Sequence, residues 1–151
     1  MNEIYDTPTA EGAEKFEPKG YDIVFEHVGF SYDEKEVLHD VSFTAKEGEV
    51  TALVGSSGSG KSTCARLAAR LWDISKGVIR VGVDISTVDP EVLLRDYSMV
   101  FQDVVLFDDT VMENIRLGKR GATDEEVRAA AKAANCDEFV HRLPQGYNTP
   151  I

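Results

Sequence analysis

The sequence predicts an α/β domain, because β-prone runs alternate with helix-prone runs along its 151 residues. Two neighbouring stretches carry this prediction. The nearly continuous apolar run EVTALVG (residues 49–55) is typical of a short strand that is buried on both faces. A glycine-rich loop follows it and leads into KSTCARLAARLW (residues 61–72), where Leu67, Leu71 and Trp72 form the apolar side of a predicted helix.

The stretches that precede this unit predict a linker and then two strands. Residues 1–20 are acidic and contain two prolines and two glycines, which is typical of a linker. Apolar residues then recur in YDIVFEHVGFSY (residues 21–32) and in VLHDVSFTA (residues 37–45), and a turn at residues 46–48 follows. We therefore expect an antiparallel β subdomain ahead of the glycine-rich loop.

The stretches that follow the predicted helix are shorter. GVIRVGVDI (residues 77–85) predicts a strand and a turn, and Pro90 is expected to open a short helix. SMVFQ (residues 98–102) predicts another short strand. Thr123 and Glu126 have the spacing of a capping box, which predicts a helix from there through Ala134.

Composition and charge exclude several classes of protein. Hydrophobic residues make up 42% of the chain and charged residues 28%, which is typical of a globular protein. The net charge of −11 argues against nucleic-acid binding, which requires clustered Lys and Arg. Cys64 and Cys136 lack CxxC spacing and are expected to be reduced thiols, and His27, His39 and His141 lack the spacing of metal ligands.

The chain shows no sign of a membrane-spanning segment or a signal peptide. No apolar run approaches the roughly 20 residues that a transmembrane helix needs. The first residues also lack the apolar stretch of a secretory signal. We therefore expect a soluble, intracellular chain that does not itself insert into a membrane.

The loop GSSGSGKST matches the pattern G-x-x-x-x-G-K-[ST] in full. Backbone N–H groups at the start of a helix can surround a phosphate chain, and side chains at the glycine positions would obstruct it. Lys61 supplies a positive charge for the β- and γ-phosphates, and the Ser62 hydroxyl is a ligand suited to Mg²⁺. The loop and its flanking strand and helix therefore predict a P-loop NTPase core that binds a nucleoside triphosphate with Mg²⁺.

Three classes of protein use such a loop. A GTPase would carry an [NT]-K-x-D motif, and this sequence has none. A small-molecule kinase would use a mobile lid with arginines, and the spacing of Arg116, Arg120 and Arg128 does not indicate one. A transporter-type ATPase is the third class, and the loop alone leaves the last two open.

Four further stretches resemble the ATP-binding-cassette (ABC) family. FSYDEKEVLHDVSF (residues 30–43) stands at the family's distance before the loop, and VFQDVVLFDDTVMENI (residues 100–115) is similar to its glutamine loop. Residues 123–149 resemble the helical subdomain of exporters in which membrane and ATPase domains share one chain, and EIYDTP (residues 3–8) resembles their linker. The resemblance implies an ABC exporter that binds ATP and Mg²⁺.

This resemblance also implies the site residues. Tyr32 matches the aromatic residue that stacks on adenine, and Gln102 matches the glutamine that reaches Mg²⁺ together with Ser62. Val37 matches a position beside the ribose or in the strand core, and Cys64 is expected to pack. The phosphates are expected to contact the whole loop, which consists of Gly55, Ser56, Ser57, Gly58, Ser59, Gly60, Lys61, Ser62 and Thr63.

Several motifs of the family do not occur in this sequence. It has no LSGGQ-type signature and no hydrophobic strand that ends in Asp-Glu, and His141 lies in the wrong place for the switch histidine. We therefore expect residues 21–151 to be the N-terminal part of a nucleotide-binding domain, with residues 1–20 as the linker after a transmembrane domain. No complete catalytic set is expected, since only Lys61 and Gln102 contribute to one.

The resemblance implies partners and a location for the parent protein. These are a second nucleotide-binding domain in a head-to-tail dimer and the coupling helices of a transmembrane domain, on the cytoplasmic side of a membrane. This chain alone is expected to hydrolyse no ATP and to be marginally stable or self-associating. The alternatives are a small P-loop kinase and a non-hydrolytic binding module that requires a complementary chain.

Overall fold

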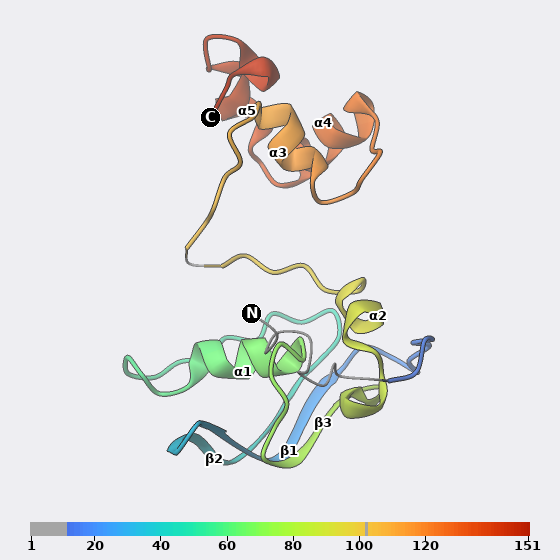
Figure 1. Cartoon of the computed structure of the whole chain (residues 1–151), viewed down its shortest axis with the longest axis vertical. Helices are drawn as coiled ribbons and strands as arrows, with labels where there is room; N and C mark the ends of the chain where they lie inside the picture. The colour runs from blue at the N-terminus through green and yellow to red at the C-terminus, as the bar shows by residue number, and fades with distance from the viewer. Residues whose placement is uncertain (1–11, 102) are drawn as a thin grey trace, which may run out of the picture. The chain divides into compact units, whose positions relative to one another are not determined.

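The computed structural model describes residues 12–101 and 103–151, which fall into two compact units (Figure 1). Unit 1 is Met1–Met99 and unit 2 is Val100–Ile151. The expected linker therefore lies largely outside the described residues, and so does its EIYDTP stretch. Residues 14–20 contain no helix or strand, while Ala13 forms an isolated parallel bridge with Val88.

Unit 1 is built on a four-stranded antiparallel sheet in the order β2-β1-β3-β4. Its strands are β1 (Ile23–Tyr32), β2 (Lys35–Ala45), β3 (Lys76–Val81) and β4 (Val83–Asp84). The predicted strands at residues 21–32, 37–45 and 77–85 are therefore confirmed, and so is the antiparallel β subdomain. Only two residues separate β1 from β2, and Asp33 adopts a left-handed φ of 51° in this tight turn.

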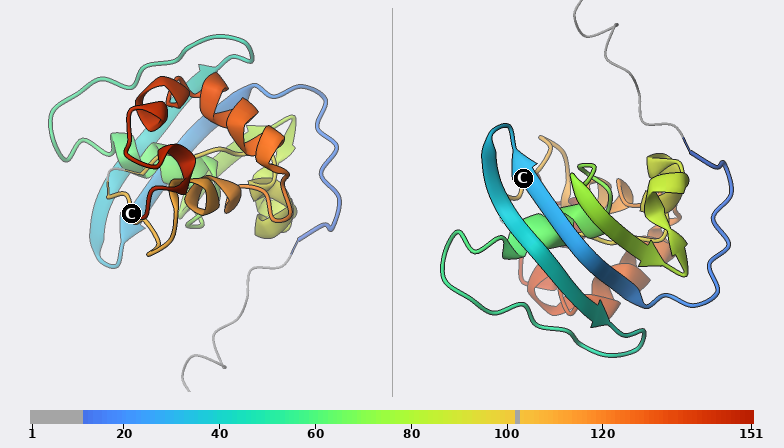
Figure 2. Two further views of the ribbon diagram at one scale, coloured as in Figure 1. Left: turned by 90° about the horizontal axis from the view of Figure 1, so that it is seen from above. Right: turned by 90° about the horizontal axis from the view of Figure 1, so that it is seen from below.

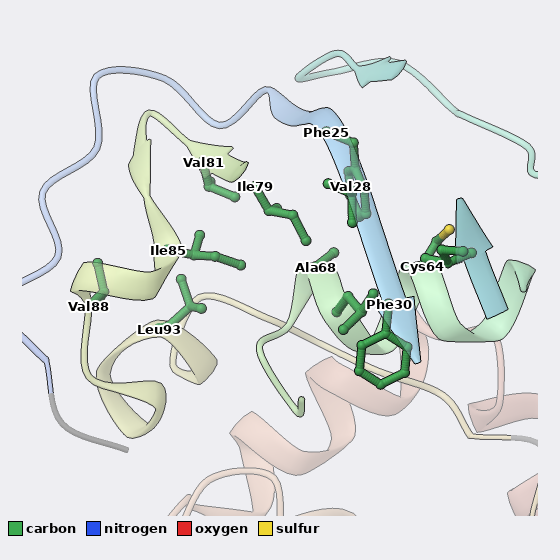
Figure 3. Packing of buried hydrophobic residues seen from close by; sticks show 12 residues of the cluster. Phe25, Val28, Phe30, Cys64, Ala68, Ile79, Val81, Ile85, Val88 and Leu93 are labelled. Atoms are coloured by element: carbon green, nitrogen blue, oxygen red, sulfur yellow. The ribbon is translucent and has the colours of Figure 1, made fainter. Parts of the chain in front are cut away.

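Helix α1 (Lys61–Ala68) lies across one face of this sheet (Figure 2). Figure 3 shows Cys64 and Ala68 of α1 in one apolar cluster with Phe25, Val28 and Phe30 of β1. These side chains are almost fully buried, and a register irregularity of β1 between Phe25 and Val28 interrupts the usual alternation of its two faces. The helix that follows the glycine-rich loop is therefore fixed by the largest apolar cluster of unit 1.

Helix α1 ends in a Schellman turn, earlier than the sequence predicts. Leu71 N donates to Arg66 O (3.0 Å) and Arg70 N donates to Leu67 O (2.9 Å). Arg70 takes the left-handed position of this turn, with φ 51°, where glycine is the usual residue. Its side chain is only 8% exposed and donates to Asp73 Oδ1 (3.1 Å) and to the Val88 carbonyl oxygen. These bonds hold the residue in an unfavourable backbone conformation.

Two short helices complete unit 1 after β4. They are the 3-10 helix η1 (Ile85–Thr87) and helix α2 (Pro90–Leu94). Pro90 opens α2 as predicted, and the Asp89 side chain caps it by accepting from Glu91 N (2.8 Å). Ile85, Val88 and Leu93 are buried in the same apolar cluster as β1 and α1 (Figure 3).

Two of the predicted strands are wrong in this structure. Residues 50–55 and 98–101 have no regular secondary structure, and Val50, Val54 and Val100 are 100%, 90% and 94% exposed. A β-strand requires a neighbouring strand to receive its backbone hydrogen bonds. The sheet of the described residues places no strand beside either run, so their β propensity is not realised.

Unit 2 is helical, as predicted for the start of a helical subdomain. Its elements are α3 (Val111–Arg116), α4 (Asp124–Ala133), α5 (Asp137–His141) and the 3-10 helix η2 (Gly146–Asn148). The capping box is confirmed, because Thr123 N donates to Glu126 Oε2 (2.9 Å) and Glu126 N donates to Thr123 Oγ (3.3 Å). The core of unit 2 contains Val127, Val140 and Tyr147.

The segments that precede α3 and follow η2 are joined by two backbone hydrogen bonds. Val111 N donates to Thr149 O (3.0 Å), and Ile151 N donates to Asp109 O (2.9 Å). Thr110 and Pro150 form the antiparallel bridge between these bonds. We call residues 109–111 and 149–151 the clasp, because they join the segments on either side of the helices of unit 2.

None of the helices formed by residues 12–101 and 103–151 has the length and apolar character that crossing a bilayer requires. Both cysteines are free thiols, as predicted. Each histidine lies beside a carboxylate and not in a metal-binding group of the described residues: His27 with Asp40, His39 with Glu36, and His141 with Asp137.

Candidate nucleotide-binding site

The glycine-rich loop ends at the start of α1, and two of its glycines are required by its backbone. Gly58 and Gly60 have φ angles of 78° and 88°, which lie in the left-handed region. A Cβ atom at Gly60 would also lie 2.4 Å from Leu38 Cδ2. Because Leu38 is only 3% exposed in the core, it has little room to move away.

The N-terminus of α1 carries no competing cap. Its N-cap residue is Gly60, which has no side chain to accept a hydrogen bond, and the first turn contains no acidic residue. The first N–H groups of an α-helix have no partner within the helix, and the helix dipole places partial positive charge there. This end of α1 is therefore free to bind an anion.

The Lys61 ammonium is folded back onto the loop. Its Nζ donates to Gly55 O (3.0 Å), to Ser56 O (2.6 Å) and to Ser59 Oγ (3.2 Å). A Lys ammonium carries three donors, and all three have partners here. The charge is thereby held at the centre of the loop, over the carbonyl groups of its first residues.

An open hollow of about 200 Å³ lies beside this loop, and no carboxylate or imidazole is among the residues that line it. Its lining consists of Val37, Gly58, Ser59, Gly60, Lys61, Ser62 and Thr63. The lining therefore combines backbone amides, hydroxyls and one ammonium, which suits a polyanion. None of these lining residues is a His, Asp or Glu, the commonest general bases.

The expected site residues fall into three groups in the structure. Val37 and Gly58 to Thr63 line the hollow together. Gly55 and Ser56 are joined to this group through the Lys61 ammonium, and Ser57 lies exposed between them and Gly58. Tyr32 does not line the hollow but packs beside Phe30 and Trp72, and Gln102 lies outside the described residues.

Cys64 follows the loop on α1 and takes no part in the hollow. Its side chain is 7% exposed and packs in the main apolar cluster of unit 1. Burial raises the pKa of this thiol above its ordinary value, although a backbone hydrogen bond opposes the shift. The thiol is therefore kept neutral, which agrees with the packing role predicted for it.

Sequence reasoning did not assign Trp72 and Arg70 to the surroundings of the site. Trp72 was predicted only as part of the apolar side of a longer helix, whereas the Schellman turn at Arg70 redirects it toward Tyr32. An arginine in the position that glycine usually takes gives no local signal for this turn. The contact with Tyr32, forty residues earlier in the chain, is likewise invisible in a local pattern.

Comparison with known proteins gives one family and several relatives. The family described as ABC transporter matches residues 38–149. The chain is 49% identical over 151 residues to ATP-binding cassette sub-family B member 6 of Mesocricetus auratus, covering 99% of this chain and 18% of that protein. It is 52% identical over 129 residues to the protein of the same name from Xenopus tropicalis, covering 84% of this chain and 15% of that protein.

A solved structure shares the fold. It is described as a bacterial Atm1-family ABC exporter with ATP bound, and it superposes with a TM-score of 0.89 at 40% sequence identity. The match covers 98% of this chain and 27% of that chain. The present chain therefore spans less than a third of the length of each protein named here.

Proposed function

This chain belongs to the ABC transporter family, and on that premise we propose that it binds Mg-ATP within the nucleotide-binding domain of an exporter. One observation carries the proposal. The Lys61 ammonium, the uncapped start of α1 and the hydroxyls of the loop surround a single hollow beside two left-handed glycines. This arrangement is suited to a chain of phosphates and to few other ligands.

Each residue of the loop has a role in this proposal. Backbone N–H groups from Gly58 to Thr63 donate to the phosphates, and Lys61 exchanges its loop carbonyls for the β- and γ-phosphate oxygens. Ser62 offers its hydroxyl to Mg²⁺. From the family resemblance we add that Tyr32 stacks on adenine and that Gln102 completes the Mg²⁺ ligands.

Hydrolysis and transport belong to the whole exporter in this proposal. No carboxylate or imidazole is among the described residues that line the hollow, and we therefore expect this chain alone to bind ATP without turning it over. Residues 21–151 supply the N-terminal part of a nucleotide-binding domain, and residues 1–20 link it to a transmembrane domain. The whole protein would then work on the cytoplasmic side of a membrane, with a second nucleotide-binding domain and with coupling helices as partners.

The test is a calorimetric titration of Mg-ATP into the chain, with phosphate release followed in the same samples. We expect binding by the parent, no phosphate release, and loss of binding in Lys61→Ala, because Lys61 is the only charged residue among the described residues that line the hollow. Lys46→Ala is the matched control, since it removes an exposed lysine from the same unit outside the loop. A Lys61→Ala variant that binds Mg-ATP as tightly as the parent would contradict the proposal.

A second candidate function is that of a module that becomes an ATPase only with a complementary polypeptide. Exposed apolar residues favour this candidate. Val50, Val54, Val100 and Val105 are each at least 80% exposed. A polypeptide that carries the signature and the Asp-Glu strand would supply neighbours for such runs. If phosphate release appears only when that polypeptide is added, the chain is one half of an ATPase.

A further inference from the structure

Three aromatic rings of unit 1 meet at the end of β1. Tyr32 lies edge-on to Phe30, with ring centroids 4.7 Å apart and planes at 89°. It lies edge-on to Trp72 as well, at 5.4 Å and 88°, and the Phe30 and Trp72 centroids are 6.4 Å apart. These are the preferred T-shaped arrangements of aromatic pairs. The Tyr32 ring is thus held from two directions.

The two neighbours of Tyr32 differ in exposure. Phe30 is 3% exposed and belongs to the core, whereas 52% of Trp72 is exposed. The hydroxyl of Tyr32 is buried and has no hydrogen-bond partner among the described residues. The orientation of the Tyr32 ring therefore depends on aromatic packing and not on a hydrogen bond, and Trp72 is the half of that packing that lies at the surface.

The backbone that carries Trp72 is itself fixed. The Schellman turn at the end of α1 places Leu71 N on Arg66 O, and the buried Arg70 side chain binds Asp73 and the Val88 carbonyl. The Trp72 indole therefore contacts Tyr32 from a turn whose conformation is fixed both by its backbone hydrogen bonds and by the Arg70 side chain. An aromatic residue in an unrestrained loop would lack this placement.

We propose that Trp72 is a positioning residue for the adenine base, because it holds the Tyr32 ring in the orientation on which the base stacks. This inference rests on the proposed function, in which Tyr32 carries the stack. Trp72 acts through Tyr32 and contributes nothing to the phosphates. Removing it raises the cost of ordering the Tyr32 ring when the base binds.

The test compares two ligands in one titration series, Mg-ATP and magnesium tripolyphosphate, which lacks the base. We expect Trp72→Leu to weaken ATP binding about two- to tenfold, the range that one aromatic pair supplies, and to leave tripolyphosphate binding unchanged. Trp72→Phe should restore ATP binding to near the parent value, since it restores an aromatic ring. Phe139→Leu is the control, because Phe139 is similarly exposed (56%) but lies in unit 2.

A double-mutant cycle with Tyr32→Leu separates positioning from general stability. If Trp72 acts through Tyr32, the double variant binds ATP no more weakly than Tyr32→Leu alone. Additive losses would overturn the inference, and so would a Trp72→Leu variant that binds ATP like the parent or loses both ligands equally. A parent that binds tripolyphosphate as tightly as ATP would refute the stacking role and this inference while keeping the proposed function. A parent that does not bind ATP would refute the proposed function itself.

Discussion

Gly60 is the residue at which the shape of the glycine-rich loop is decided. It combines a left-handed φ of 88° with a close approach to Leu38, so both its backbone and its missing side chain matter. We predict that Gly60→Ala lowers the free energy of unfolding by about 2–4 kcal/mol, from strain and from the clash together. Urea denaturation followed by circular dichroism measures this loss.

Gly48→Ala is the matched control for that prediction. Gly48 also has a positive φ, 75°, but a Cβ there would meet nothing within 4 Å. Its cost should therefore be the backbone strain alone, about 1 kcal/mol. Equal losses in the two variants would show that the contact with Leu38 has no effect on stability.

Individual residues of the loop were predictable from the sequence because their chemistry is local. The glycines, Lys61 and Ser62 follow one another in the chain, and a helix that begins at Lys61 brings them together without help from distant segments. Tyr32 and Trp72 are different, since their contact depends on how β1 packs against the end of α1. No periodicity or spacing in the sequence encodes that contact.

At the scale of the element, the end of α1 contains backbone strain at Arg70 that substitutions can measure. Arg70 occupies a left-handed position that favours glycine, and its side chain compensates by binding Asp73 and the Val88 carbonyl. We predict that Arg70→Ala is less stable than Arg70→Gly by about 1 kcal/mol, because both lose the side-chain bonds but only alanine keeps the strain. Both variants should be less stable than the parent in urea denaturation. If Arg70→Gly is the less stable variant, the strain is not relieved by glycine.

The capping box at the start of α4 makes the stability of unit 2 depend on pH. The pKa of Glu126 is lowered by its hydrogen bond from Lys119, by the Thr123 backbone N–H and by the charge of Lys119. A carboxylate whose pKa is lowered on folding stabilises the fold above its unfolded pKa of about 4.3, and this contribution is lost as the pH falls through the lower folded value.

We therefore predict that Glu126→Gln removes part of the loss of stability on acidification below about pH 4.3, since a neutral amide does not titrate. Urea denaturation at a series of pH values measures this difference between the parent and the variant. Glu125→Gln is the control, because Glu125 lies one residue earlier on the same helix and has no part in the capping box. Identical acid profiles for the parent and Glu126→Gln would contradict the assignment.

Predicted strands form where the sheet supplies a neighbouring strand, whether that neighbour lies close in the sequence, as β2 does to β1, or far away, as β1 does to β3. β1 and β2 are joined by a two-residue turn, so the pattern of each supports the other. Residues 49–55 and 98–102 have the same β-prone composition, but pairing depends on a neighbour that a local pattern does not contain. The sequence therefore predicts the tendency to form a strand and not the presence of a partner.

For the whole molecule, the exposed apolar runs predict association in solution. Val50 lies in the run of residues 49–55 and is 100% exposed, and Val105 lies in the apolar run VVLF (residues 104–107) and is 80% exposed. Unpaired β-prone segments readily pair with other chains. We predict that the parent chain sediments as oligomers and that Val50→Lys combined with Val105→Lys shifts it toward the monomer. The net charge of −11 opposes association but acts weakly at physiological salt.

Leu117→Lys is the control for sedimentation, because Leu117 is exposed (55%) but lies outside both runs. This substitution should leave the oligomers unchanged. Substitutions at such exposed positions change stability by no more than about 0.5 kcal/mol, so the monomer should remain folded. A parent chain that is monomeric, with one sharp melting transition, would contradict the prediction.

The clasp of unit 2 has a consequence for protein engineering. Because residues 109–111 lie beside residues 149–151, the segment that contains the helices between them begins and ends at adjacent positions. A segment with adjacent ends can be grafted into a surface turn of an unrelated host without spreading the host's backbone. Residues 109–151 are thus suited to transfer into another protein, and the clasp marks the points at which to cut them out.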